Sequence, residues 1–185
     1  MAVPTTWQDL FGLAIAAALA FPYSASGLRN RMNQFYFDQV NANLVQRLTN
    51  PFASDPMVPR GLTWRHVRSV FYNLVNSDKA LTHHSQRAFR NGALWTSAAD
   101  LRAISLIGIV AFIAMLFIGQ SFEAAHFPPH RAMIGVLACI LLASLSIPIS
   151  SALTRRQIEI GNEQVEHIMT YHRQTLRDRL SNIQV

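Results

Sequence analysis

The fold of this chain is most constrained by the absence of charge between residues 132 and 154. No Asp, Glu, Lys or Arg occurs over these 23 positions, and about 20 apolar residues let a helix cross roughly 30 Å of hydrocarbon. A second uncharged run, residues 103–119, is rich in Ile, Leu, Phe and Ala. Pro128-Pro129 lies between the runs and prevents one helix from continuing through both. We therefore expect residues 103–154 to form a transmembrane hairpin.

A third uncharged run, residues 10–28, precedes the hairpin in the sequence. Its centre is rich in alanine, and Pro22 interrupts it. A secretory signal is the competing interpretation, because the small residues 24–26 resemble a cleavage site, but no basic residue precedes the run. A membrane helix is favoured, with an interfacial or re-entrant segment as the alternative. The predicted fold class is all-α: an integral membrane protein with about three transmembrane helices plus cytoplasmic helices.

The distribution of basic residues predicts the orientation. Segment 29–102 contains ten Lys or Arg and the tail after residue 154 contains five, whereas the hairpin turn contains only Arg131. Lys and Arg accumulate on the cytoplasmic side of membrane spans. We expect a membrane location, the bacterial inner membrane, with the N-terminus outside and the C-terminus in the cytoplasm. Contact with anionic lipid headgroups then accounts for the basic excess, and no nucleic-acid partner is expected.

Four segments follow from these patterns. Residues 1–28 are the N-terminal membrane helix, and residues 29–102 a helical cytoplasmic segment with a Pro-rich linker at 50–61. A stripe at Val67, Val70, Phe71 and Leu74 predicts a helix within that segment, and its last part is expected to continue into the next span. Residues 103–154 are the hairpin. Residues 155–185 are predicted to be one amphipathic cytoplasmic helix.

The residues that could carry chemistry do not assemble into a recognisable site. His83-His84 are neighbours that diverge on a helix, and prolines separate His126 from His130. Glu163 and His167 are four residues apart, which predicts a surface pair. No phosphate-binding loop or catalytic motif is present in the sequence. We expect no enzyme activity, no catalytic or cofactor-binding residues, no metal site and no cofactor.

The predicted spans instead carry a face of small residues. It comprises Gly108 in the middle span and, in the last span, Gly135, Cys139, Ala143, Ser146 and Ser150. Small residues let membrane helices approach closely, so this set predicts a helix-packing face or a pore face. Pro148 predicts a helix bend. Trp95, Arg155 and Arg156 are the predicted membrane-interface anchors.

The order of these segments, and the Ile-Pro element in LLASLSIPISSALTRRQIEIGNEQVE, resembles the TolQ/ExbB/MotA family of proton-channel stator proteins. That resemblance implies an oligomer around a pore. The hairpin with flanking helices is also similar to two-span effectors of bacterial defence systems, which implies pore formation as well. The interpretation that the sequence favours is a non-enzymatic structural or accessory subunit of a larger membrane complex. Its partners would be other membrane subunits or further copies of itself.

Overall fold

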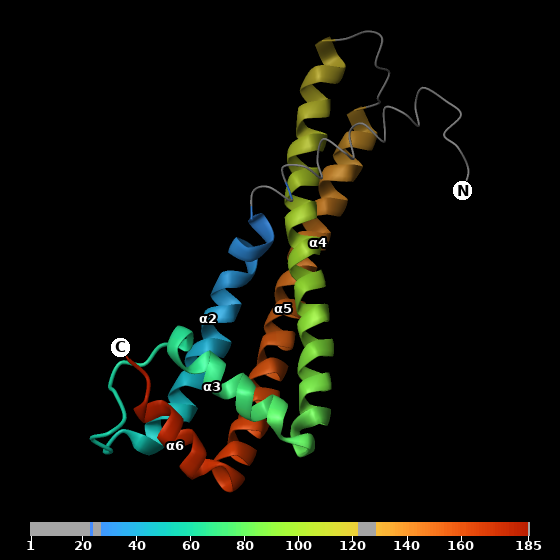
Figure 1. The fold of residues 1–185 in the computed structure, drawn as a ribbon. Helices are drawn as coiled ribbons and strands as arrows, with labels where there is room; N and C mark the ends of the chain where they lie inside the picture. Colours follow the sequence, from blue (N-terminus) through green and yellow to red (C-terminus); the bar gives the residue numbers. More distant parts are fainter. Residues whose placement is uncertain (1–22, 24–26, 122–128, 185) are drawn as a thin grey trace, which may run out of the picture. The chain divides into compact units, whose positions relative to one another are not determined.

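The computed structural model of the 185-residue chain describes residue 23 and residues 27–121 and 129–184, and all regular structure among them is helical (Figure 1). The predicted all-α class is therefore confirmed for this part of the chain. The first predicted span lies outside the described residues except for Tyr23, Gly27 and Leu28. In chain order the elements are α2 (Leu28–Thr49), η1 (Asn50–Phe52), α3 (Trp64–Ser77), η2 (Lys79–Leu81), α4 (Thr82–Ser121), α5 (Pro129–Tyr171) and α6 (Arg173–Ser181).

Among the described residues, two helical stretches are long and apolar enough to cross a membrane. They are Lys79–Phe117 and Pro129–Tyr171, with mean hydropathies of 2.1 and 2.4 in their most apolar 18 residues. Only 11% of each of these apolar stretches is buried inside the protein, whereas the core helix of a water-soluble protein would be mostly buried. The two spans of the predicted hairpin thus have the length and composition of membrane helices.

The long helices extend beyond the predicted spans. The last part of segment 29–102 continues into the middle span, as expected, because α4 is one helix of 40 residues. Helix α5 begins at Pro129, where a proline is tolerated because the first helical N–H needs no intrahelical partner. It passes Pro148 and residue 155 without interruption and ends at Tyr171.

The prediction of one helix through the whole tail is wrong at His172. This residue caps the start of α6 with φ −127° and ψ 18°, outside helical values. Its side chain bonds to Asp78, far away in the sequence, and a local pattern cannot anticipate such a contact. The tail is therefore the end of α5 followed by the separate nine-residue helix α6.

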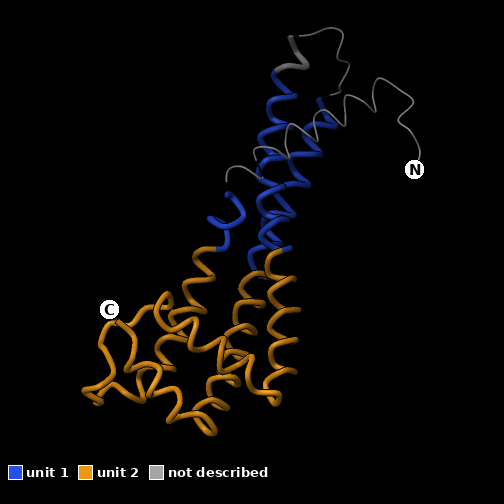
Figure 2. Tube along the Cα trace, in the orientation of Figure 1, with its two compact units in different colours: residues 1–33, 97–148 blue, residues 34–96, 149–185 orange. Residues whose placement is uncertain are grey.

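The chain forms two compact units (Figure 2). Unit 1 comprises residues 1–33 and 97–148, and unit 2 comprises residues 34–96 and 149–185. Helices α4 and α5 each contribute to both units, and the division within α5 falls directly after Pro148.

Unit 2 contains a hydrophobic core assembled from every helix that enters it. The predicted stripe of α3 is buried as expected, and so are residues from α2, α5 and α6. Thr63 begins α3 with a capping box, in which the backbone N–H of Thr63 donates to Nδ1 of His66 at 3.1 Å. The side chains that contribute most to the core are fully buried: Leu48, Val67, Leu74, Leu81, Ile160, Ile168, Leu176 and Leu180.

Unit 1 has the opposite distribution of side chains. Its most deeply buried residues include small ones: Ala103, Ser105, Ala132 and Ser146 are at most 3% exposed. Its large apolar residues face outward, and those more than half exposed include Val110, Phe117, Ile134, Leu137 and Leu141. A monomer in water rarely exposes so continuous an apolar surface.

Candidate functional site

Within unit 1, two of the predicted small residues lie in tight contacts between α4 and α5. A Cβ atom added at Gly108 would lie 2.8 Å from Sγ of Cys139, and one added at Gly135 would lie 2.7 Å from the ring of Phe112. Neither distance leaves room for a larger side chain without movement of the opposite helix or ring. Gly108, Gly135 and Cys139 thus contribute to packing inside the hairpin.

The remaining members of the small-residue face differ in their surroundings. Ala143 is half-buried, and its carbonyl accepts a 2.6 Å hydrogen bond from Oγ of Ser146, which is fully buried. Ser150 is also fully buried, but it belongs to unit 2, where its carbonyl accepts from the hydroxyl of Thr154 at 2.7 Å. The predicted small-residue face is therefore divided between the two units at Pro148.

Arg102 is a neighbour of this face that the sequence did not identify. Its guanidinium donates to Oγ of Ser146 at 3.0 Å and to the backbone carbonyl of Ser146 at 3.2 Å. Arg102 immediately precedes the uncharged run, so its charge helped to define where the span begins. The sequence could not show that the Arg102 side chain contacts Ser146, because this contact depends on how α4 packs against α5. A cationic side chain therefore contacts α5 two residues before Pro148.

A second polar contact in unit 1 joins the start of α2 to α4. Arg29 donates to both carboxylate oxygens of Asp100, at 2.5 and 2.6 Å, and the Tyr23 hydroxyl donates to the same carboxylate. Such a bidentate pair fixes the relative orientation of the two side chains more strongly than a single hydrogen bond does. The contact holds the beginning of α2 against the middle of α4, just before its uncharged run.

The three predicted interface anchors have different environments in unit 2. Arg155 and Arg156 are exposed, as contact with headgroups would require. Trp95 is only 4% exposed and belongs to the core instead, with its ring centroid 4.6 Å from that of Phe37. Its indole surface is covered by protein. The position of Trp95 before a span predicts an interface anchor, but a position in the sequence cannot show that α2 packs over this residue.

A cluster in unit 2 brings together Asp78, His167 and His172. Nε2 of His167 and Nε2 of His172 lie 2.7 and 2.8 Å from the same oxygen, Oδ2 of Asp78. The other carboxylate oxygen accepts the backbone N–H of Ala80 at 2.8 Å. The hydrogen bond with His172, followed by those with Ala80 and His167, lowers the pKa of Asp78 to about 2. The group joins the end of α3 to both sides of the α5–α6 break.

The predicted surface pair of Glu163 and His167 is wrong. Glu163 accepts from Arg87 of α4 at 2.9 Å, and Nδ1 of His84 lies 3.0 Å from the same oxygen. His167 bonds to Asp78 instead. Spacing of four residues places two side chains near each other on a helix, but the elements packed alongside decide which partner each one takes.

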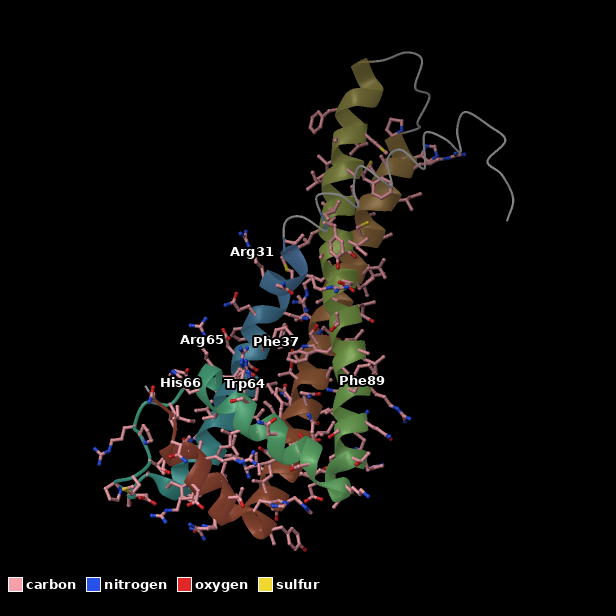
Figure 3. All side chains as sticks on the ribbon, in the orientation of Figure 1. Arg31, Phe37, Trp64, Arg65, His66 and Phe89 are labelled. Atoms are coloured by element: carbon pink, nitrogen blue, oxygen red, sulfur yellow. The ribbon has the colours of Figure 1, made fainter. Side chains whose placement is uncertain are left out.

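Unit 2 also contains a surface hollow of about 340 Å³ lined by aromatic and amide side chains. Phe37, Trp64 and Phe89, labelled in Figure 3, come from α2, α3 and α4 and line it. Phe89 is 78% exposed, so its ring lies at the open edge of the hollow. Among the lining residues no charged side chain is present, and the lining gives no indication of a specific ligand.

A comparison of the chain with protein-family models, with curated proteins and with solved structures finds no match. The function must therefore be inferred from the two units themselves.

Proposed function

We propose that this chain is a non-enzymatic integral membrane subunit, a structural or accessory component of a larger membrane complex. The observation that carries the proposal is the outward-facing apolar surface of unit 1. Large side chains such as Val110, Phe117, Leu137 and Leu141 are exposed on helices long enough to cross a bilayer. Lipid tails and the helices of neighbouring subunits are the surroundings in which such a surface is stable.

The small-residue face supports the same proposal in a more specific way. Gly108 and Gly135 let the two helices of the hairpin approach closely, which makes the hairpin a compact element with large apolar side chains directed outward. Membrane helices associate through close packing rather than through the hydrophobic effect. In this proposal the small residues let the two helices of the hairpin pack together, and the outer apolar surface binds neighbouring subunits.

Unit 2 is proposed to lie on the cytoplasmic side of a bacterial inner membrane. Its core is fully formed from the side chains of one chain, and the exposed Arg155 and Arg156 follow directly after the apolar stretch of α5. Cationic side chains at this position favour the leaflet that carries anionic headgroups. The unit would present a rigid helical surface to the cytoplasmic parts of a complex.

The composition of the purified particle tests this proposal. Native mass spectrometry after mild detergent extraction is expected to show the chain with other membrane proteins at a fixed ratio. A ring that contains only this chain would favour the alternative of an oligomeric pore of the stator or effector type. A monomer that keeps no partner under the mildest extraction contradicts both.

A matched pair of variants sharpens that experiment. Leu141→Phe changes the outer surface of the hairpin, where Leu141 is 60% exposed, without removing apolar area. If this surface binds another subunit, recovery of that subunit should fall while membrane insertion stays unchanged. Met57→Leu, at a 64% exposed position of unit 2, is the control and should alter neither.

A further inference from the structure

Asp78, His167 and His172 are the one group among the described residues whose donor atoms could meet a single metal ion. One ligand atom from each lies within 4.8 Å of the other two. Two imidazoles and a carboxylate are a ligand set used by zinc and by other divalent transition metals. The three side chains are between 17% and 31% exposed, so the group is partly enclosed yet accessible from solvent.

The fold brings all three ligands together. Asp78 precedes η2, and its Oδ1 is held by the N–H of Ala80, which directs Oδ2 toward the histidines. His167 lies on α5, and His172 occupies the break before α6. An outer hydrogen bond of the Ala80 type orients a metal-bound carboxylate. The ring of Tyr171 lies against His167 with the centroids 4.6 Å apart.

The distances from the two histidines to Asp78 fit a small ion with modest adjustment. Zinc binds imidazole nitrogen and carboxylate oxygen at about 2.0–2.2 Å, so tetrahedral ligands lie roughly 3.3 Å apart. The two Nε2···Oδ2 distances of 2.7 and 2.8 Å would open by about half an ångström, within the reach of side-chain rotation. Three protein ligands leave a fourth position for water.

We propose that Asp78, His167 and His172 form a binding site for one divalent transition-metal ion, of which Zn²⁺ is the representative. The ion would join the end of α3 to α5 and to the start of α6. Each Nε2 must offer its lone pair, so its proton moves to Nδ1 of the same ring, or to solvent if the ring was protonated. This proposal does not depend on the function proposed for the hairpin.

The direct test is titration of the purified full-length chain, stripped with a chelator, with Zn²⁺ and with Co²⁺. One Zn²⁺ per chain is expected to bind and to raise the melting temperature of the protein. Co²⁺ should give the strong visible absorption of a four-coordinate ion. Loss of one ligand should weaken binding at least about tenfold, because even changes to the outer hydrogen bonds of such sites cost 10–100-fold.

The most informative variants are His167→Gln and His172→Gln. A glutamine amide still donates to Asp78, so the hydrogen-bonded arrangement is kept while a nitrogen ligand is lost. His83→Ala is the matched control, because His83 is exposed on α4 and lies outside the group. It should leave the affinity and the Co²⁺ spectrum unchanged.

Two results would overturn the proposal. The first is Zn²⁺ binding that is equal in both glutamine variants and the parent, which would place the metal elsewhere. The second is no binding at micromolar Zn²⁺ by a parent chain whose helical circular dichroism is intact. In that case the three residues only form hydrogen bonds with one another and do not bind a metal ion.

Discussion

Nε of Arg177 donates to Oδ2 of Asp55, which joins helix α6 to the Pro-rich linker. The sequence separation of the two residues is 122 positions. The other carboxylate oxygen of Asp55 accepts the backbone N–H of Met57 at 3.0 Å. Together these contacts, with Arg177 the larger cause, hold the pKa of Asp55 below its usual value of 3.8. The Asp55 side chain is 14% exposed and is therefore well enclosed for a linker residue.

The stability of unit 2 should consequently depend on the charge of Asp55. Because its pKa is lower in the folded than in the unfolded chain, the contribution is complete above the usual value of 3.8 that applies to the unfolded chain. It is lost as the pH falls below that value and through the folded pKa. We expect Asp55→Asn to lower the melting temperature at pH 7 and to differ much less from the parent near pH 3. Thermal melts across pH 3–7 measure this.

Arg177→Gln provides the matched test of the partner. Arg177→Gln should lower the melting temperature at pH 7 as much as Asp55→Asn does. The variant with both substitutions should melt only slightly lower than either single variant, because both substitutions remove the same interaction. Additive losses in the double variant would show that the two side chains act separately.

Gly135 should not tolerate a larger side chain. A Cβ atom there would lie 2.7 Å from the Phe112 ring, and overpacking of this kind typically costs about 1–3 kcal/mol. We expect Gly135→Val to lower the melting temperature of the detergent-solubilised protein. Gly92→Ala is the control, since nothing lies within 4 Å of that position; alanine in a helix should be neutral or stabilising by up to about 1 kcal/mol. Equal effects of the two substitutions would contradict close packing at Gly135.

Cys139 is the only cysteine of the chain and can report on membrane insertion. It is half-buried on α5, next to Gly108 of the opposite helix. A maleimide that cannot cross membranes should leave it unlabelled in intact vesicles and label it after denaturation. Rapid labelling in intact vesicles would place this part of α5 in water.

Orientation can be tested with the same reagent. In a Cys139→Ala background, Met57→Cys places a thiol at a position that is 64% exposed in the parent. We expect labelling in inside-out vesicles and protection in right-side-out vesicles. The reverse pattern would invert the proposed topology.

Ile168 is expected to be a sensitive position of unit 2. Its side chain is fully buried, and truncation of such a residue to alanine typically costs about 2–5 kcal/mol, because a cavity remains. Ile168→Ala should therefore lower the melting temperature strongly, whereas Met57→Ala should change it little. A small effect at Ile168 would mean that the core around α5 can close the cavity.

Local patterns predicted the helices that depend on periodicity and on composition. The stripe of Val67, Val70, Phe71 and Leu74 placed α3 correctly, and the prolines of residues 50–61 marked the linker between α2 and α3. The absence of charge located the apolar parts of α4 and α5. These features are properties of neighbouring residues, so they are visible in the sequence.

The contacts between distant segments could not be predicted in this way. Asp78 lies 89 and 94 positions from its two histidines, and Trp95 is buried because α2 packs over it. The close contact at Gly161, where an added Cβ would lie 2.9 Å from Leu44, was not predicted either. In each case the deciding neighbour comes from another helix. A single sequence records the residues but not their pairing.

The core of unit 2 requires the end of the chain as well as its middle. Residues 34–96 are synthesised before the hairpin, and residues 149–185 after most of it. During translation, α2 and α3 must therefore wait with their apolar sides uncovered until α5 and α6 have left the ribosome. The core of unit 2 therefore cannot be completed before the hairpin has been synthesised. A chain truncated at any point within the hairpin would leave uncovered helices that cellular proteases and chaperones recognise.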